Sequence, residues 1–172
     1  LKNVLVYTIP IILTSLLQLL FNAADLIIVS RYSEIKSIAM AAVSATGSIT
    51  TLIVNMFIGL SVGGGVRVAH AYGAQDSEEA HKTVHTAILF AVLSGIFVTF
   101  VGITFCETFL TWMGTPDTVL PLSATYMRFY FAGAISMMVY NFGASILRAV
   151  GDSKRPLYFL AIAGVLNVLL NL

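Results

Sequence analysis

Long apolar runs separated by short polar segments dominate the chain. Each run holds about 17 predominantly apolar residues or more, whereas the strands of a membrane barrel alternate apolar and polar positions over about ten residues. Runs of this kind are typical of helices that cross a bilayer, because a helix pairs its backbone amides within itself. Five membrane-spanning helices are therefore predicted, at residues 4–30, 38–66, 83–105, 122–147 and 156–172.

Composition supports an all-α membrane protein. Hydrophobic residues make up 58% of the 172 residues and charged residues only 10%, and the mean hydropathy is +0.93. Ordinary soluble domains are about 25% charged. A net charge of +1 without a basic run offers no electrostatic basis for binding nucleic acid. The single Cys106 and the absence of a metal-ligand pattern or an enzyme motif predict no disulfide, no bound cofactor and no enzymatic activity.

The ends of the sequence and its helix-breaking residues shape the expected organisation. The sequence starts at Leu1 and stops at Leu172 within an apolar run, so it is expected to be part of a longer protein. Pro10 lies inside the first predicted span, where it removes a backbone donor and predicts a bend. The glycines at 63–65 are expected to end or loosen the second span.

Lys and Arg are distributed unevenly between the two sets of segments that flank the spans. Six of them lie at the amino end and in the second and fourth connections, against two in the first and third, or three if Arg128 is counted there. Positively charged segments tend to remain on the cytoplasmic side. The amino terminus of this multi-pass protein is therefore predicted to be cytoplasmic.

Asp25 lies well inside a predicted span, where a charge costs several kcal/mol. Thr14, Gln18 and Asn22 precede it at intervals of four, four and three, so these polar side chains share one helix face. At 1.5 Å per residue, Asp25 lies about 30 Å from the cytoplasmic end, in the outer half of the membrane. A carboxylate so placed can bind a proton or a small cation reversibly. The alternative is a structural acid, and the depth of Gln18 and Asn22 favours the coupling role.

Three further spans carry polar ladders. The second repeats small or polar residues every fourth position, from Thr51 through Asn55 to Gly63, and close helix packing is the favoured interpretation. The fifth places Asn167 and Asn171 on one face, where hydrogen bonding between helices is favoured. The fourth holds a ladder that is equally consistent with a binding face and with ordinary helix filling, formed by Tyr126, Tyr130, Ala134, Met138, Asn141 and Ser145.

The order and spacing of several short motifs resemble the amino-terminal lobe of the multidrug and toxic compound extrusion (MATE) family of efflux transporters. The resemblance covers essentially the whole chain, as five of the six helices of that lobe. Each motif alone has little specificity, but the series is specific. The motifs are Ile9-Pro10, Leu17-Gln18, Asn22-x-x-Asp25, Tyr72-Gly73-Ala74, the run from Arg148 to Pro156, and Asn167-x-x-x-Asn171.

The resemblance implies twelve helices in two six-helix lobes, related by a pseudo-twofold axis along the membrane normal, in a bacterial cytoplasmic membrane. It also implies export of small amphipathic, often cationic, compounds by antiport against protons or sodium ions, and the full-length protein is expected to be monomeric. By resemblance, Pro10 matches a first-helix proline whose bend accompanies the change of state. The residues expected at the coupling-ion or substrate cavity are Gln18, Asn22, Asp25, Tyr126, Asn141, Asn167 and Asn171.

One position departs from the family pattern. Several family members have an acid where this chain has Asn171, so a two-acid cation site is not expected. Asp25 with neutral amides suits one proton, or one weakly held sodium ion, and the proton is favoured. Two alternatives remain: a lipid-linked saccharide flippase of the same superfamily, which should carry several buried basic residues, and a membrane structural subunit with no transport of its own.

Overall fold

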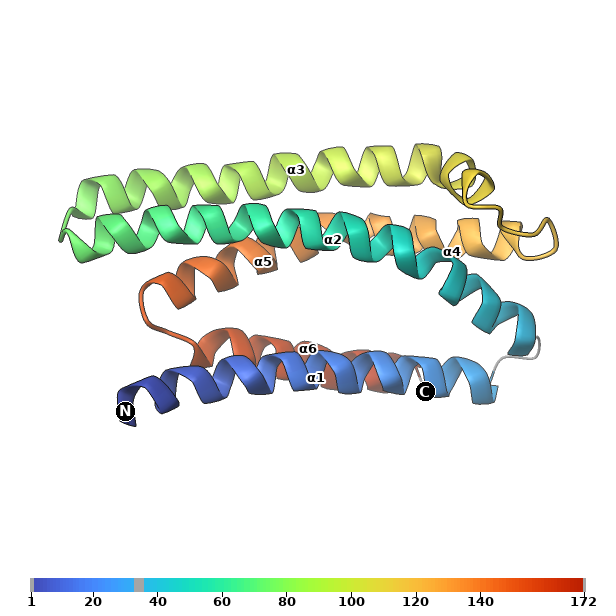
Figure 1. The fold of residues 1–172 in the computed structure, drawn as a ribbon, viewed down its shortest axis with the longest axis horizontal. Coiled ribbons are helices and arrows are strands. Elements are labelled where there is room, and N and C mark those ends of the chain that lie inside the picture. The colour runs from blue at the N-terminus through green and yellow to red at the C-terminus, as the bar shows by residue number, and fades with distance from the viewer. Residues whose placement is uncertain (1, 33–35, 172) are drawn as a thin grey trace.

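The computed structural model describes residues 2–32 and 36–171, with side chains for residues 4–28 and 41–170. All regular secondary structure in these residues is helical, as the sequence predicts. Figure 1 shows the helices running roughly along one common direction. The helices are α1 (Lys2–Tyr32), α2 (Lys36–Gly73), α3 (Ser77–Trp112), α4 (Leu120–Ala132), α5 (Ala134–Ala149) and α6 (Lys154–Asn171).

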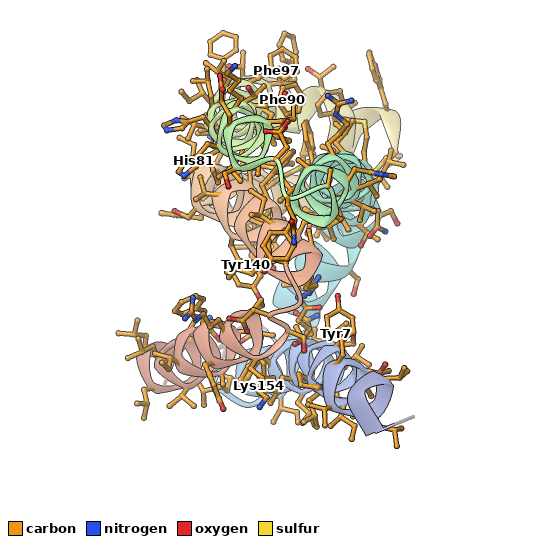
Figure 2. All side chains as sticks on the ribbon, turned by 90° about the vertical axis from the view of Figure 1, so that its left-hand side faces the viewer. Tyr7, His81, Phe90, Phe97, Tyr140 and Lys154 are labelled. Atoms are coloured by element: carbon orange, nitrogen blue, oxygen red, sulfur yellow. The ribbon has the colours of Figure 1, made fainter. Side chains whose placement is uncertain are left out.

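The helices form two groups. α1 and α6 lie side by side, and α2, α3, α4 and α5 pack together above them in Figure 1. α1 also contacts α2, and α6 contacts α5, so the pair is joined to the larger group along both of its helices. The view along the helices in Figure 2 shows the same division.

The five predicted spans correspond to α1, α2, α3, the pair α4 and α5, and α6. Within the described residues, three helices are long and apolar enough to cross a membrane: Val4–Ile28 of α1, Ala41–Gly73 of α2 and α3. The α4–α5 pair provides a fourth crossing if it is taken as one bent span. α6 has 18 residues and begins with two basic residues, and it is not among these candidates.

The connection between the second and third spans is much shorter than the sequence predicts. α2 continues to Gly73 and α3 begins at Ser77, so both helices extend beyond the predicted spans and only residues 74–76 connect them. The glycines at 63–65 do not end α2; instead Gly65 packs so closely on Ser145 of α5 that a Cβ would overlap the hydroxyl. The start of α3 is capped by Asp76, whose Oδ1 accepts a hydrogen bond from the Glu79 amide at 2.9 Å.

The fourth predicted span is not one continuous helix. α4 ends at Ala132, α5 starts at Ala134, and their axes differ by 47°. A break leaves backbone groups without their usual helical partners. Here the hydroxyl of Thr99 on α3 donates to the carbonyl of Phe131 at 2.9 Å. The neighbouring helix therefore satisfies a carbonyl at the break.

The best-packed region lies where α3, α4 and α5 meet. Large side chains of α4 and α5 are fully buried there, and most of the buried residues that α3 presents to them are small. Gly102 lies directly against the ring of Phe131, and a Cβ on Gly95 would lie 2.7 Å from the Cα of Ile135. Close approach of this kind replaces the hydrophobic effect as the source of helix association in a bilayer. The largest fully buried apolar side chains are Leu110, Met127, Phe131 and Met138.

Candidate functional site

A cavity of about 580 Å³ lies between α1 and the larger helix group. Its walls come from α1, α2, α4 and α5, and α6 reaches it through Leu160. Figure 2 shows Tyr140 in the space between the two groups, where its hydroxyl donates to the carbonyl of Pro156 at 3.2 Å. The size is within the range of small-molecule sites.

α1 contributes two carboxamides to this cavity. Gln18 and Asn22 are one turn apart, so they project from the same face, with the half-buried ring of Phe21 beside them. Within the described part of the chain, neither carboxamide has a hydrogen-bond partner. Each offers both a donor and an acceptor to a molecule in the cavity.

α2 forms a second polar wall. The buried hydroxyls of Thr46 and Thr50 donate to carbonyls of their own helix, that of Val43 at 2.9 Å and that of Thr46 at 3.0 Å, which leaves the hydroxyl oxygens able to accept. Thr51 and Asn55 also line the cavity. The carboxamide of Asn55 has no hydrogen-bond partner among the described residues.

The predicted packing role of the second ladder is therefore wrong for these residues. Thr51 and Asn55 face the cavity, while added Cβ atoms on Gly59 and Gly63 would meet nothing within 4 Å. The four-residue spacing correctly indicated that these residues share one face of α2. The small residues among them suggested that this face packs against another helix, whereas Thr51 and Asn55 face the cavity. The same spacing on the first span, which ends at Asp25, indicated a cavity, and it could have indicated one here.

α4 and α5 provide an aromatic wall. Tyr126 and Tyr130 come from α4, and Met137, Tyr140 and Asn141 come from α5. The hydroxyl of Tyr130 donates to the sulfur of Met137 at 3.8 Å, and the amide of Asn141 donates to the Met137 carbonyl at 2.9 Å. These contacts fix the side chains on both sides of the helix break. The oxygen of Asn141 is left to accept a hydrogen bond.

Asp25 is adjacent to the cavity without being one of its lining residues. It is half-buried on α1, three residues after Asn22, and its carboxylate interacts electrostatically with the hydroxyl of Tyr126. Thr14, the first member of the predicted stripe, is buried and donates to the carbonyl of Pro10 at 2.8 Å. α1 runs through Pro10 without a break.

Four of the seven residues predicted for the cavity line it together: Gln18, Asn22, Tyr126 and Asn141. Asn167 on α6 does not: it is exposed and does not line this cavity. The side chain of Asn171 lies outside the described residues. Helical spacing identified the residues of one face, but it could not tell which side of α6 meets α1.

The lining mixes polar and apolar side chains, and it holds no Lys, Arg, Asp or Glu among the described residues. It combines carboxamides, hydroxyls and aromatic rings, which suit recognition of small organic molecules. The fold and the cavity define a multi-pass helical membrane protein with a partly polar cavity between its two helix groups. Comparison with known proteins identifies the family: the chain belongs to the MatE family, whose model matches residues 10–172.

Curated relatives include transporters. The chain is 31% identical over 169 residues to the probable multidrug resistance protein YoeA of Bacillus subtilis (strain 168), covering 98% of this chain and 36% of that protein. It is 26% identical over 151 residues to an FAD transporter of Shewanella oneidensis, covering 88% of this chain and 33% of that protein. The chain thus spans about a third of the length of these relatives.

Solved structures of MATE proteins share the fold. One is the outward-facing conformation of a multidrug resistance MATE family transporter of the MOP superfamily. It superposes with a TM-score of 0.88 and 27% identity, over 99% of this chain and 37% of that one. The overall arrangement of the helices therefore belongs to a known transporter fold.

Proposed function

We propose that the intact protein is a cation-coupled exporter of small amphipathic, often cationic, organic compounds, and that this chain supplies most of its amino-terminal lobe. The observation that carries the proposal is the cavity in which Gln18, Asn22, Tyr126 and Asn141 meet beside Asp25. The kinship with proteins named as multidrug resistance proteins supports the same function. Transport itself requires the second lobe, because alternating access moves two lobes against each other.

The chemistry of the lining supports a varied set of substrates. The faces of Tyr126 and Tyr130 attract organic cations, and Met137 adapts its flexible side chain to ligands of different shape. A flippase for pyrophosphate lipids would need basic side chains in the cavity. The described lining contains none, which favours amphipathic organic substrates over phosphate-bearing lipids.

Asp25 is the proposed coupling residue. A charge inside a membrane span is costly, so binding of one proton or one sodium ion offsets that cost. The carboxylate interacts with Tyr126, which lines the cavity, so neutralising its charge changes the environment of a bound cation. Such a difference between the two states is what any switch requires. The proton is favoured over sodium, since neutral amides rather than a second acid accompany Asp25.

The proposed cycle follows from the orientation. With the amino terminus cytoplasmic, Asp25 lies in the outer half of a bacterial inner membrane and takes its cation from outside. α1 then bends near Pro10, where the missing backbone donor makes bending least costly. The cavity beside α1 shrinks, and the substrate leaves. No cofactor is required, and the full-length protein works as a monomer.

Efflux from vesicles that contain the full-length parent tests this proposal. A proton gradient or a sodium gradient is imposed separately, and the export of a fluorescent cation is recorded for the wild type and Asp25→Asn. Gradient-driven export should be lost in the variant, and the effective gradient identifies the ion. Asp117→Asn, in the exposed connection between α3 and α4, is the matched control and should retain export. Full export by Asp25→Asn contradicts the coupling role, and no export by the wild type contradicts the exporter itself.

A further inference from the structure

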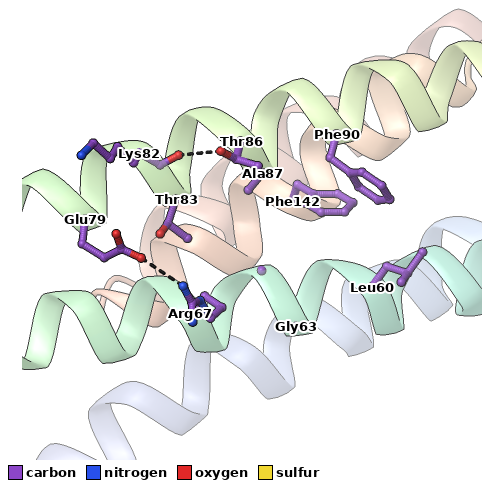
Figure 3. A pocket seen from close by; sticks show the side chains of 11 residues that line it. Leu60, Gly63, Arg67, Glu79, Lys82, Thr83, Thr86, Ala87, Phe90 and Phe142 are labelled. Atoms are coloured by element: carbon purple, nitrogen blue, oxygen red, sulfur yellow. Dashed lines mark hydrogen bonds and ion pairs between the residues drawn. The ribbon is translucent and has the colours of Figure 1, made fainter.

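A second cavity, separate from the cavity beside α1, lies between α2 and α3 near the turn that joins them. It is a groove of about 440 Å³ that shares no lining residue with the cavity beside α1. Figure 3 shows its apolar end, where Leu60 projects from α2 and Phe90 from α3. Phe142 of α5 lies between the two helices, with its ring centroid 5.8 Å from that of Phe90. Nothing in the proposed transport cycle uses this groove.

Two glycines give the groove its depth. A Cβ on Gly63 would meet no atom within 4 Å, so that position is open space. A Cβ on Gly64 would lie 3.7 Å from both Ala87 and Phe142, which form the floor. A larger side chain at position 63 would therefore occupy the groove without displacing its walls.

The other end of the groove is charged. The Arg67 guanidinium and the Glu79 carboxylate face each other across it at 3.0 Å, as Figure 3 shows. Their side chains are 73% and 45% exposed, so the pair contributes little to stability and can exchange partners readily. Lys82 also lines this end and pairs with Glu78 at 2.6 Å.

The groove is apolar at one end and charged at the other, in the same order along the membrane normal as the acyl chains and headgroup of a lipid. α2 crosses with 33 residues and α3 with 36, more than the roughly 20 needed for the hydrocarbon core, so their shared turn reaches the headgroup region. Leu60 lies seven residues before Arg67, which is about 10 Å along the helix axis. Apolar walls thus lie towards the bilayer centre and the ion pair towards the headgroups.

We infer that this groove binds a phospholipid whose headgroup carries a phosphate and a primary ammonium, with an acyl chain between Leu60 and Phe90. The phosphate pairs with Arg67 and the ammonium with Glu79, so both members of the ion pair exchange one partner for another. Lys82 is already paired with Glu78, so a purely anionic headgroup would satisfy Arg67 but leave the Glu79 carboxylate facing a negative charge. A quaternary ammonium could not donate the charge-assisted hydrogen bond that Glu79 accepts. The inference is independent of the direction and coupling of transport.

Native mass spectrometry of the full-length parent in detergent tests the headgroup. Dioleoyl phosphatidylethanolamine should bind about fivefold more tightly than the phosphatidylglycerol or phosphatidylcholine with the same chains. Glu79→Gln should weaken phosphatidylethanolamine binding about fivefold and leave phosphatidylglycerol binding equal or stronger. Equal affinities of the wild type for the three lipids, or unchanged phosphatidylethanolamine binding by Glu79→Gln, would overturn the inference. Because Glu79 is partly exposed, the variant keeps the fold.

A pair of glycine substitutions on α2 tests the groove itself. Gly63→Leu fills the space and should lower phosphatidylethanolamine binding about tenfold. Gly59→Leu places the same side chain one turn away, also in open space but outside the groove, and should leave binding unchanged. Equal effects of the two variants, or no bound lipid in the wild type, would show that the groove is not a lipid site. An unchanged elution volume in gel filtration verifies that both variants are folded.

Discussion

The ring of Phe21 on α1 lies directly over Gly164 on α6, so closely that a Cβ at position 164 would overlap ring atoms. Phe21 also lines the cavity beside α1, together with Gln18 and Asn22. The contact therefore positions the cavity wall as well as joining the two helices. Small residues at such contacts permit the close approach on which helix association in a bilayer depends.

Gly164→Ala should accordingly destabilise the full-length protein. Overpacking of this kind costs about 1–3 kcal/mol, so the midpoint of thermal unfolding in detergent should fall. Phe21→Leu in the same chain should restore much of the loss, because the overlapping ring atoms are removed. Gly143→Ala is the control: its Cβ would meet nothing within 4 Å, and alanine is the better helix former. A normal midpoint for Gly164→Ala would contradict the close contact.

The turn between α5 and α6 depends on a glycine for a different reason. Gly151 has φ +88°, a left-handed conformation that costs a residue with a Cβ about 1–2 kcal/mol. Asp152 follows it and accepts hydrogen bonds from the amides of Lys154 and Arg155, both at 3.1 Å, at the start of α6. Gly151→Ala should lower the unfolding midpoint although its Cβ has space, and Gly151→Asn should lower it less. Equal midpoints for both variants and the wild type would exclude strain at this turn.

The break in the fourth span is stabilised by one hydroxyl of α3. Thr99→Val keeps the shape of the side chain but removes the donor to the Phe131 carbonyl, and an unsatisfied buried acceptor costs about 1–3 kcal/mol. Thr104→Val, on the exposed side of the same helix, is the matched control and should be neutral. Thermal unfolding of the two full-length variants measures the difference. If both variants unfold at the same temperature, the hydrogen bond at the break has no role in stability.

Asn55 is the strongest test of the cavity as a binding site, because the sequence ladder suggested packing for it. Asn55→Leu removes the donor and acceptor that face the cavity and should raise the KM for an exported fluorescent compound about tenfold in the full-length parent. Met56→Leu changes the neighbouring residue, which does not line the cavity, and should leave KM unchanged. An unaltered KM for Asn55→Leu would place the substrate elsewhere.

Apolar runs were sufficient to predict the helices, but not where they end. Arg67 and His70 are polar, yet they continue α2 because a helix that has left the hydrocarbon needs no apolar side chains. The break at Gly133 was not predictable either. Gly133 has φ −82°, a conformation open to any residue, so no local backbone requirement marks the bend, and the close contacts of Phe131 and Ile135 with α3 lie on either side of it.

The candidate site was predictable to the extent that it depends on helix faces. Gln18 and Asn22 share a face by spacing alone, and that face meets the cavity. The outward position of Asn167 and the inward position of Asn55 depend on how each helix is rotated against its neighbours. That rotation comes from contacts such as Phe21 on Gly164, between residues 143 positions apart, which no periodicity within one helix can reveal.

The 47° turn at Gly133 has a geometric consequence for the cavity beside α1. In a straight helix, the fifteen residues from Tyr126 to Asn141 would separate the two side chains by about 22 Å along one axis. The turn shortens this separation by only about 2 Å, but it directs the two helices along the cavity at different angles, and Tyr126, Tyr130, Met137 and Asn141 all line it. One piece of chain thus borders the cavity with two differently inclined helices, so a change in the angle at Gly133 would move Tyr126 and Tyr130 relative to Met137 and Asn141.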